Sequence, residues 1–193
     1  MKFNWISLLL LFLGLSGYAQ IKSEREFRIK KSQFPVISFE KAQPYLEGVR
    51  RLRFYKEIDA GRVSYEIKFK KARLHYSVEF SDAGDLEDIE VRIKPVDIPE
   101  ESWKLMEDHL SGAFQKYKVR KIQQQYRRST FPSDSVTFRN AFQNLLLPEI
   151  RYELIVHAKT ADGYRDFEIT YDARGSFIGM KKSLPPNYDH VLY

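Results

Sequence analysis

The chain has 193 residues, of which 43% are hydrophobic, 30% charged and 15% aromatic, and its formal net charge is +6. This composition excludes extended disorder, collagen-like repeats and polytopic membrane proteins, and the length suits one domain or a pair of small related ones. The absence of cysteine excludes disulfides, thiolate metal sites, a cysteine nucleophile and a lipoprotein anchor.

Residues 1–19 have the pattern of a secretory signal peptide. Lys2 precedes an apolar run from Trp5 to Leu15, and Gly17 and Ala19 place small residues before a cleavage site at Gln20. The run is shorter than the ~20 residues that a spanning helix needs, and no later segment is apolar enough to cross a bilayer. We therefore predict a periplasmic or secreted protein without a transmembrane anchor after cleavage.

A first unit is predicted over residues 34–97, after a polar, flexible N-terminal arm at residues 20–33. Apolar residues recur at helical spacing from Pro35 to Val49, with an interruption at Pro44. The period then changes to two in four successive segments, which predicts four half-buried antiparallel strands. In the second of these segments the alternating apolar residues are Val63, Tyr65, Ile67 and Phe69.

The same order of patterns returns over residues 98–184. Pro99 and the acids after it favour a helix start, and Trp103, Met106, Leu110 and Phe114 form one apolar stripe. Strands are predicted around residues 117–126, 151–159, 164–171 and 177–181. The fold class expected is α+β, with two tandem repeats that each comprise a helix and a four-stranded antiparallel meander sheet, the helix packed on one face.

The second unit contains an insertion at residues 129–148 that the first unit lacks. Phe138 and Phe142 begin an apolar pattern at helical spacing, and Ser135 could cap this helix. Phe131, Phe138 and Phe142 are costly to expose, so the insertion is expected either to cover the sheet or to act as a binding arm. Residues 185–193 form a C-terminal tail.

The motifs Tyr-Glu-Ile-Lys-Phe at residues 65–69, Tyr-Ser-Val-Glu-Phe at residues 76–80 and Asp-Ala-Gly at residues 82–84 carry a family resemblance. With the regions around them, about residues 34–184, they resemble the PepSY-like, or beta-lactamase-inhibitor-protein-like, family of exported bacterial proteins. The resemblance implies a periplasmic or secreted binding module, in some cases a peptidase inhibitor, with no catalytic residues to carry over. The insertion and the basic charge depart from the family pattern.

No motif for catalysis or metal binding is present. The sequence contains neither His-Glu-x-x-His nor Gly-x-Ser-x-Gly, and its four histidines are scattered. We therefore predict no metal, no cofactor, no catalytic residues and no enzymatic activity. A pair of carboxylates depends on spacing in three dimensions, so an envelope hydrolase that uses paired carboxylates stays open as the alternative function.

The basic residues form groups on the predicted sheet. Lys68 and Lys70 lie by the first hairpin, and Arg120, Arg127 and Arg128 lie on the fifth strand. Export argues against nucleic acid as the partner, which leaves an envelope protein, an acidic polysaccharide or anionic lipid headgroups. The expected function is a non-enzymatic binding module of the cell envelope. Its predicted partner-binding residues are Phe131, Phe138, Phe142, Arg120, Arg127, Arg128, Lys68 and Lys70.

Overall fold

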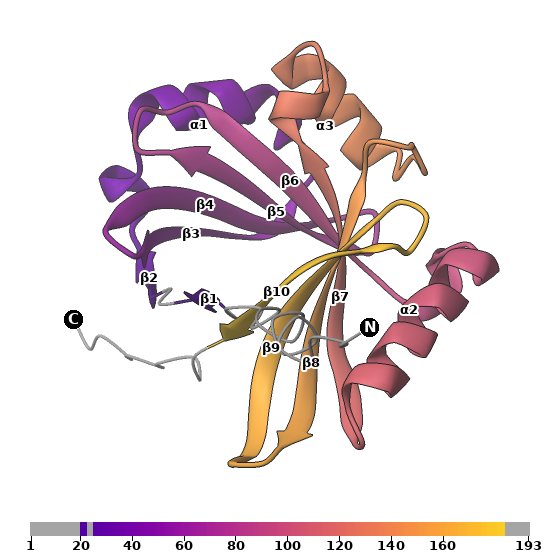
Figure 1. Cartoon of the computed structure of the whole chain (residues 1–193). Coiled ribbons are helices and arrows are strands. Elements are labelled where there is room, and N and C mark those ends of the chain that lie inside the picture. Colours follow the sequence, from indigo (N-terminus) through magenta and orange to yellow (C-terminus); the bar gives the residue numbers. More distant parts are fainter. Residues whose placement is uncertain (1–19, 23–24, 184–193) are drawn as a thin grey trace, which may run out of the picture.

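The computed structural model describes residues 20–22 and 25–183 (Figure 1). The predicted signal peptide and the C-terminal tail lie outside the described residues. None of the described helices is long and apolar enough to span a membrane.

One continuous sheet of ten strands contains every described strand, in the order β1-β10-β9-β8-β7-β6-β5-β4-β3-β2. Neighbours from β2 to β10 are antiparallel, and β1 pairs in parallel with β10. The strand bounds are β1 Gln20–Lys22, β2 Arg25–Ile29, β3 Arg50–Asp59, β4 Arg62–Lys71, β5 Leu74–Ser81, β6 Leu86–Ile93, β7 Tyr117–Arg127, β8 Arg151–Thr160, β9 Gly163–Asp172 and β10 Phe177–Ser183.

The single sheet shows that the prediction of two helix-plus-four-strand repeats is wrong. Strand β6 pairs with β7 from Asp88↔Arg127 to Ile93↔Ile122, so no boundary separates two meanders. Two separate sheets would each have left one of these strands as an unpaired edge, and their pairing removes both edges. Alternation along a strand predicts which side chains share a face, but it does not predict the strand's lateral neighbour.

The N-terminal segment was expected to be a flexible arm, but it forms strands at both ends of the sheet. Strand β1 pairs with β10, whereas β2 pairs with β3. Only two residues separate Lys22, the end of β1, from Arg25, the start of β2. Three peptide units span at most about 11 Å, so the sheet must curl until its two ends almost meet.

Three α-helices cover one face of the sheet, which we call the covered face (Figure 1). Helix α1 runs over Val36–Ala42, α2 over Glu100–Ala113 and α3 over Asp134–Phe142, with 3₁₀ helices at Lys31–Gln33, Gln43–Tyr45, Pro95–Asp97 and Arg128–Thr130. Side chains of the central strands on this face, such as Ile67, Val78 and Ile89, are fully buried. Burial of each such side chain contributes about 1.5–3 kcal/mol, and this face is therefore the core.

The insertion belongs to this core. Phe138 of α3 is fully buried and stacks on Tyr45 at 3.9 Å between ring centroids, and Phe142 contacts the ring of Tyr76 at 5.1 Å. Ser133, rather than the predicted Ser135, caps α3, because its hydroxyl accepts a hydrogen bond from the amide of Val136. The predicted apolar pattern continued beyond Phe142, but the helix ends there.

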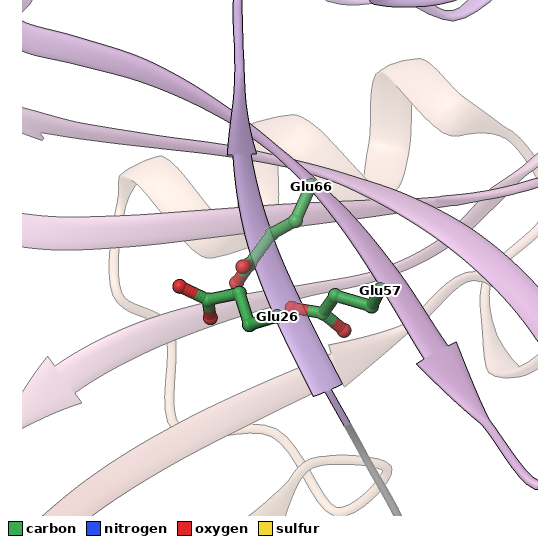
Figure 2. A group of neighbouring side chains, drawn as sticks. All are labelled: Glu26, Glu57 and Glu66. Carbon is green, nitrogen blue, oxygen red and sulfur yellow. The ribbon is translucent and has the colours of Figure 1, made fainter. Parts of the chain in front are cut away.

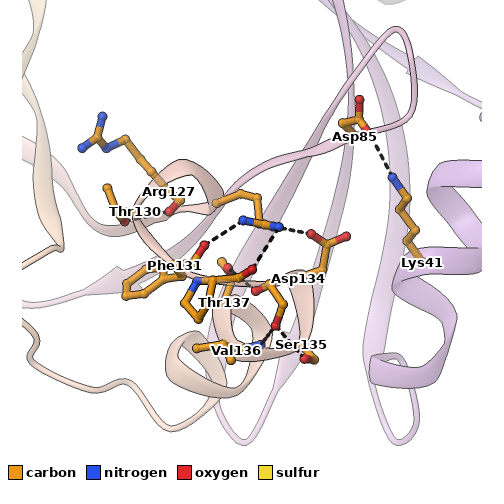
Figure 3. Close-up of polar contacts among 12 residues, drawn as sticks. Lys41, Asp85, Arg127, Thr130, Phe131, Asp134, Ser135, Val136 and Thr137 are labelled. Atoms are coloured by element: carbon orange, nitrogen blue, oxygen red, sulfur yellow. Dashed lines mark hydrogen bonds and ion pairs between the residues drawn. The ribbon is translucent and has the colours of Figure 1, made fainter.

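Two glycine turns fix α1 and α2 against the sheet. Gly84 and Gly175 both have positive φ, +84° and +87°, and each lies so close to a helix that a Cβ atom would overlap it. At Gly175 the overlap is with the carbonyl oxygen of Ser102 in α2, at 2.3 Å. At the Gly84 turn, the ammonium of Lys41 donates to the Gly84 carbonyl and pairs with Asp85 (Figure 3).

Candidate binding face

The other face of the sheet, which we call the open face, carries the polar residues of the same alternation. Cross-strand register places Glu66, Glu79, Asp88 and Arg127 in one row across β4, β5, β6 and β7. These residues alternate with the buried core residues along their strands, so their side chains project away from the helices.

The open face is hollowed into a trough of about 1690 Å³. The trough extends from β2 across the central strands to β10, and its lining is mainly charged and polar. None of the three described α-helices contributes to the lining, because all three pack on the covered face, and only the 3₁₀ helix Arg128–Thr130 reaches the trough. Among the described residues, the trough is therefore a concave surface that the α-helices leave open.

Three carboxylates converge near the β2 edge of the trough (Figure 2). Glu26 of β2, Glu57 of β3 and Glu66 of β4 bring one oxygen each to within 4.8 Å of one another. Glu57 is 9% exposed and Glu66 is 7% exposed, so both carboxyls have lost most of their hydration. Burial, followed by the repulsion between Glu57 and Glu66, raises the pKa of Glu66 well above its usual value.

The pKa of Glu57 is also raised, mainly by burial, although its side-chain hydrogen bond with Glu66 acts in the opposite direction. The ammonium of Lys68 pairs with Glu26 and lies 2.7 Å from Glu66 Oε2. Burial disfavours the charge on Lys68, but Glu66 and Glu26 more than compensate and raise its pKa. The cluster is thus a carboxyl pair that favours one bound proton, next to a permanently charged lysine.

Carboxylate oxygens in such a group are also potential ligands for a hard cation such as Ca²⁺. In this structure, however, the Lys68 ammonium already lies against Glu26 and Glu66. A metal ion would have to displace this lysine and overcome its repulsion. The residues present therefore form an internal ion pair rather than a ready metal site.

A second acidic group lies in the middle of the trough. Burial raises the pKa of Asp88 well above its usual value, and Glu90 and Glu79 add to the effect. The amide of Gln125 donates to Asp88 at 3.0 Å, and the amide of Gln123 donates to Glu90. The centre of the trough is consequently acidic, whereas the sequence predicted a basic sheet face.

The predicted basic residues are dispersed by the structure. Lys68 belongs to the carboxylate cluster, Arg127 lies in the trough opposite Asp88, and Arg120 is exposed at the other end of β7. Arg128 also reaches the trough, but it pairs with Asp134 and donates to the Phe131 carbonyl, so it holds the segment before α3 (Figure 3). Lys70 lies on β4 beside His75 of β5.

The three predicted phenylalanines do not form an exposed surface. Phe138 is fully buried, Phe131 is 8% exposed, and Phe142 is half-buried against Tyr76 and Phe69. Contact with a partner through these rings would require α3 to leave the sheet. The structure thus places the insertion among the elements that cover the sheet.

The sequence analysis missed Glu26, Glu57 and Glu66 as a group. Glu57 shares the open face of β3 with Tyr55, but the sequence analysis did not identify the residues that lie beside it. The carboxyls meet because β2 and β4 both pair with β3, and nothing in the sequence placed residues 25–29 in the sheet.

Comparisons with known proteins show the fold. A DUF2874 family protein from Bacteroides ovatus ATCC 8483 is 10% identical, with a TM-score of 0.52 over 77% of this chain and 87% of that chain. A DUF2874 family protein from Bacteroides uniformis ATCC 8492 is 9% identical, with a TM-score of 0.51 over 77% and 88%. A candidate periplasmic protein from Bacteroides eggerthii DSM 20697 is 8% identical, with a TM-score of 0.50 over 77% and 88%.

At these identities the likeness extends to the fold alone. A scan against family models found no match, and a search of curated proteins also found none.

Proposed function

We propose that this protein is an exported, non-enzymatic binding module of the cell envelope that holds a partner in the trough on its open face. The observation that carries the proposal is the trough itself, which is about 1690 Å³ in volume, concave and lined by polar residues from nearly every strand. Specific interfaces combine a preformed shape with polar groups that fix orientation. The periplasmic description of one structural neighbour and the predicted signal peptide support export.

The PepSY-like resemblance supports a more specific form of this proposal, in which the partner is a peptidase that the trough inhibits. The trough has a charged lining with acids at its centre, so a partner with a complementary basic segment would fit it.

Site-specific photo-crosslinking in the native envelope tests the proposal. Tyr55 lines the trough and is half-buried, so a photoreactive phenylalanine in its place keeps an aromatic ring at the site. The matched control carries the same group at Leu105, which is 52% exposed on α2. We expect a discrete crosslinked product from position 55 alone. Equal crosslinking from both positions, or none from position 55, would contradict the proposal.

A hydrolase that uses paired carboxylates is the second candidate, and the Glu57–Glu66 pair is the observation that favours it. Both carboxyls have a raised pKa, as a proton-donating acid requires, and they share a side-chain hydrogen bond. Glycosidase carboxyls stand about 5–9.5 Å apart, so a pair in direct contact is closer to a proton-sharing dyad. Lys68 lies against Glu66, so its ammonium already occupies one oxygen of the pair.

The substitution Glu57→Gln separates the two functions. A dyad that performs hydrolysis would lose its activity on envelope peptides and glycans, because an amide cannot exchange the shared proton. A binding module would keep the crosslink from position 55. Loss of a measurable hydrolytic activity in Glu57→Gln, with that activity present in the unmodified protein, would establish the hydrolase instead.

A further inference from the structure

A second hollow adjoins the trough where β5 begins and β6 ends. Its volume is about 520 Å³, and its walls come from the β4–β5 hairpin, the segment between β6 and α2, the start of β7 and the ring of Trp103 on α2. Five cationic side chains line it: Arg73, Arg92, Lys94, Arg120 and Lys121. We call this hollow the basic groove.

The lining of the basic groove has many more cationic than anionic side chains. Asp97 is its one carboxylate, and this side chain accepts a hydrogen bond from the backbone amide of Lys94 at 2.8 Å. Five cations around one carboxylate repel one another, so a bound anion would stabilise the arrangement.

Two backbone irregularities keep cations at this site. A β-bulge between Val119 and Lys121 places Arg120 and Lys121 together at the start of β7. The two-residue β4–β5 hairpin has positive φ at Ala72 (45°) and Arg73 (72°), a conformation that Asn-Gly adopts more easily. The bulge and the hairpin thus hold three of the five cations in place.

The positive charges around the groove also affect its histidine, His75. His75 lines the groove and is exposed, and its pKa is lowered by partial burial and by the positive charges of Lys70, Arg92 and Arg51. A bound anion would offset those charges, so His75 is a built-in reporter of ligand binding.

We propose that the basic groove binds a linear acidic polysaccharide. The groove adjoins the trough, to which the proposed function assigns the partner, and shares Arg92, Arg120 and Lys121 with it, whereas Arg73, Lys94 and Trp103 line the groove alone. The cations match carboxylate or sulfate groups repeated along a chain, and arginine recognises such groups in a bidentate manner. The side chain of Trp103 supplies an apolar ring surface in the same wall, against which a sugar ring can pack.

The shape and surroundings of the groove favour a polysaccharide over the other polyanions of an envelope. A flat anionic membrane would meet the exposed acids Glu100 and Glu101, which begin α2 beside the groove. An acidic peptide could not add to the sheet here, because β5, β6 and β7 are each paired on both sides. A narrow, flexible polyanion avoids both obstacles.

Tryptophan fluorescence provides a direct test. The chain has two tryptophans, so the full chain with Trp5→Phe retains Trp103 alone, in the groove wall. We expect saturable quenching or a spectral shift on titration with polygalacturonate, weakened by added salt because the attraction is screened. Neutral dextran should cause no change. A parallel NMR titration should show the pKa of His75 rising when polygalacturonate is bound.

Charge-reversal variants locate the site. Arg73→Glu with Lys94→Glu changes two exposed groove residues that do not line the trough, and we expect the affinity for polygalacturonate to fall by roughly tenfold or more. The control is Lys159→Glu with Arg165→Glu, which makes the same charge change at exposed residues outside both hollows. An equal loss in both double variants would show a nonspecific charge effect and overturn the proposal.

Two further probes distinguish the sources of negative charge. Polyglutamate or phosphatidylglycerol vesicles that bind more tightly than polygalacturonate would overturn the choice of polysaccharide. The position-55 crosslink reports on the trough, so it should survive Arg73→Glu with Lys94→Glu. A failure of polysaccharide binding and a failure of the trough proposal can therefore be told apart.

Discussion

The covered face and the open face of the sheet consist of alternate residues on the same strands, but different interactions fix their side chains. On the covered face, Ile67 and Val78 are neighbours across β4 and β5, and both are completely buried. One residue earlier on β4, Glu66 lies opposite Glu79 on the open face, and both carboxylates help to raise the pKa of Asp88. Like charges directly opposite each other destabilise a sheet. The covered face therefore stabilises the fold, whereas the charged side chains of the open face destabilise it.

The comparison predicts the largest loss of stability for the core part of the insertion. Phe138→Ala removes a fully buried ring that stacks on Tyr45, so we expect a loss of about 3–5 kcal/mol in the free energy of unfolding, measured with urea. Leu146→Ala, at a side chain 53% exposed in the same insertion, should cost less than about 0.5 kcal/mol. Similar values for both variants would mean that the insertion does not belong to the core.

The glycine turn that fixes α2 gives the next largest effect. Gly175→Ala adds a Cβ atom 2.3 Å from the Ser102 carbonyl oxygen at a φ of +87°, and we expect it to cost about 2–4 kcal/mol. Gly112→Ala is the control within α2, where a Cβ atom meets nothing within 4 Å. It should raise stability by up to about 1 kcal/mol, because alanine favours the helix. Thermal unfolding of both variants measures the contrast.

On the open face, removal of a charge should increase stability. Because the folded-state pKa values of Glu57 and Glu66 exceed the ordinary value of 4.5, protonation favours the folded protein. Their contribution is fully present below about pH 4.5 and is lost as the pH rises through the folded-state pKa values. Glu57→Gln should therefore stabilise the protein by about 1 kcal/mol at neutral pH and flatten the pH profile of urea unfolding.

The exposed residue Glu101 provides the control for that substitution. Glu101→Gln at the start of α2 should change stability by less than about 0.5 kcal/mol and leave the slope with pH in place. A destabilised Glu57→Gln variant would show that the carboxyl pair contributes to folding, and the contrast between the two faces would not hold at this position.

The smallest expected effect is that of a substitution at Arg73, which should increase the stability of the protein and decrease its affinity for polygalacturonate. Arg73→Gly relieves a left-handed residue with φ 72° in the hairpin, which should raise stability by about 0.5–1 kcal/mol. The same change removes a cation from the basic groove and should weaken polygalacturonate binding. A variant that gains stability without losing affinity would remove Arg73 from the proposed site.

The covered face could be predicted from the sequence, and particular elements show why. The alternation of Val63, Tyr65, Ile67 and Phe69 predicted β4, and the stripe of Trp103, Met106 and Leu110 predicted the face of α2 that packs on the sheet. Apolar side chains that recur with a regular period lie on one face of a strand or helix. Since that face must be buried away from water, the period alone identifies the buried side.

The open face could not be predicted in the same way. The carboxyl cluster depends on β2, whose residues Arg25, Glu26 and Arg28 gave no apolar alternation. The basic groove gathers Arg73, Arg92 and Arg120 from strand ends far apart in the sequence, and only the register and the β6–β7 pairing bring them together. A charged residue is tolerated on any solvated surface, so its type says little about its neighbours.

The contact of β1 with β10 has a consequence for the order of folding. Gln20 pairs with Lys181, about 160 residues later, so the first strand to leave the ribosome must wait for the last described strand before it can pair. Pairing over such a separation is slow, because a long loop must close before the contact forms. The other strands pair with neighbours close in sequence and can assemble first. We therefore expect sheet closure to be the last step of folding. If the protein is exported as proposed, the chain could complete this step only after nearly all of it had crossed the membrane.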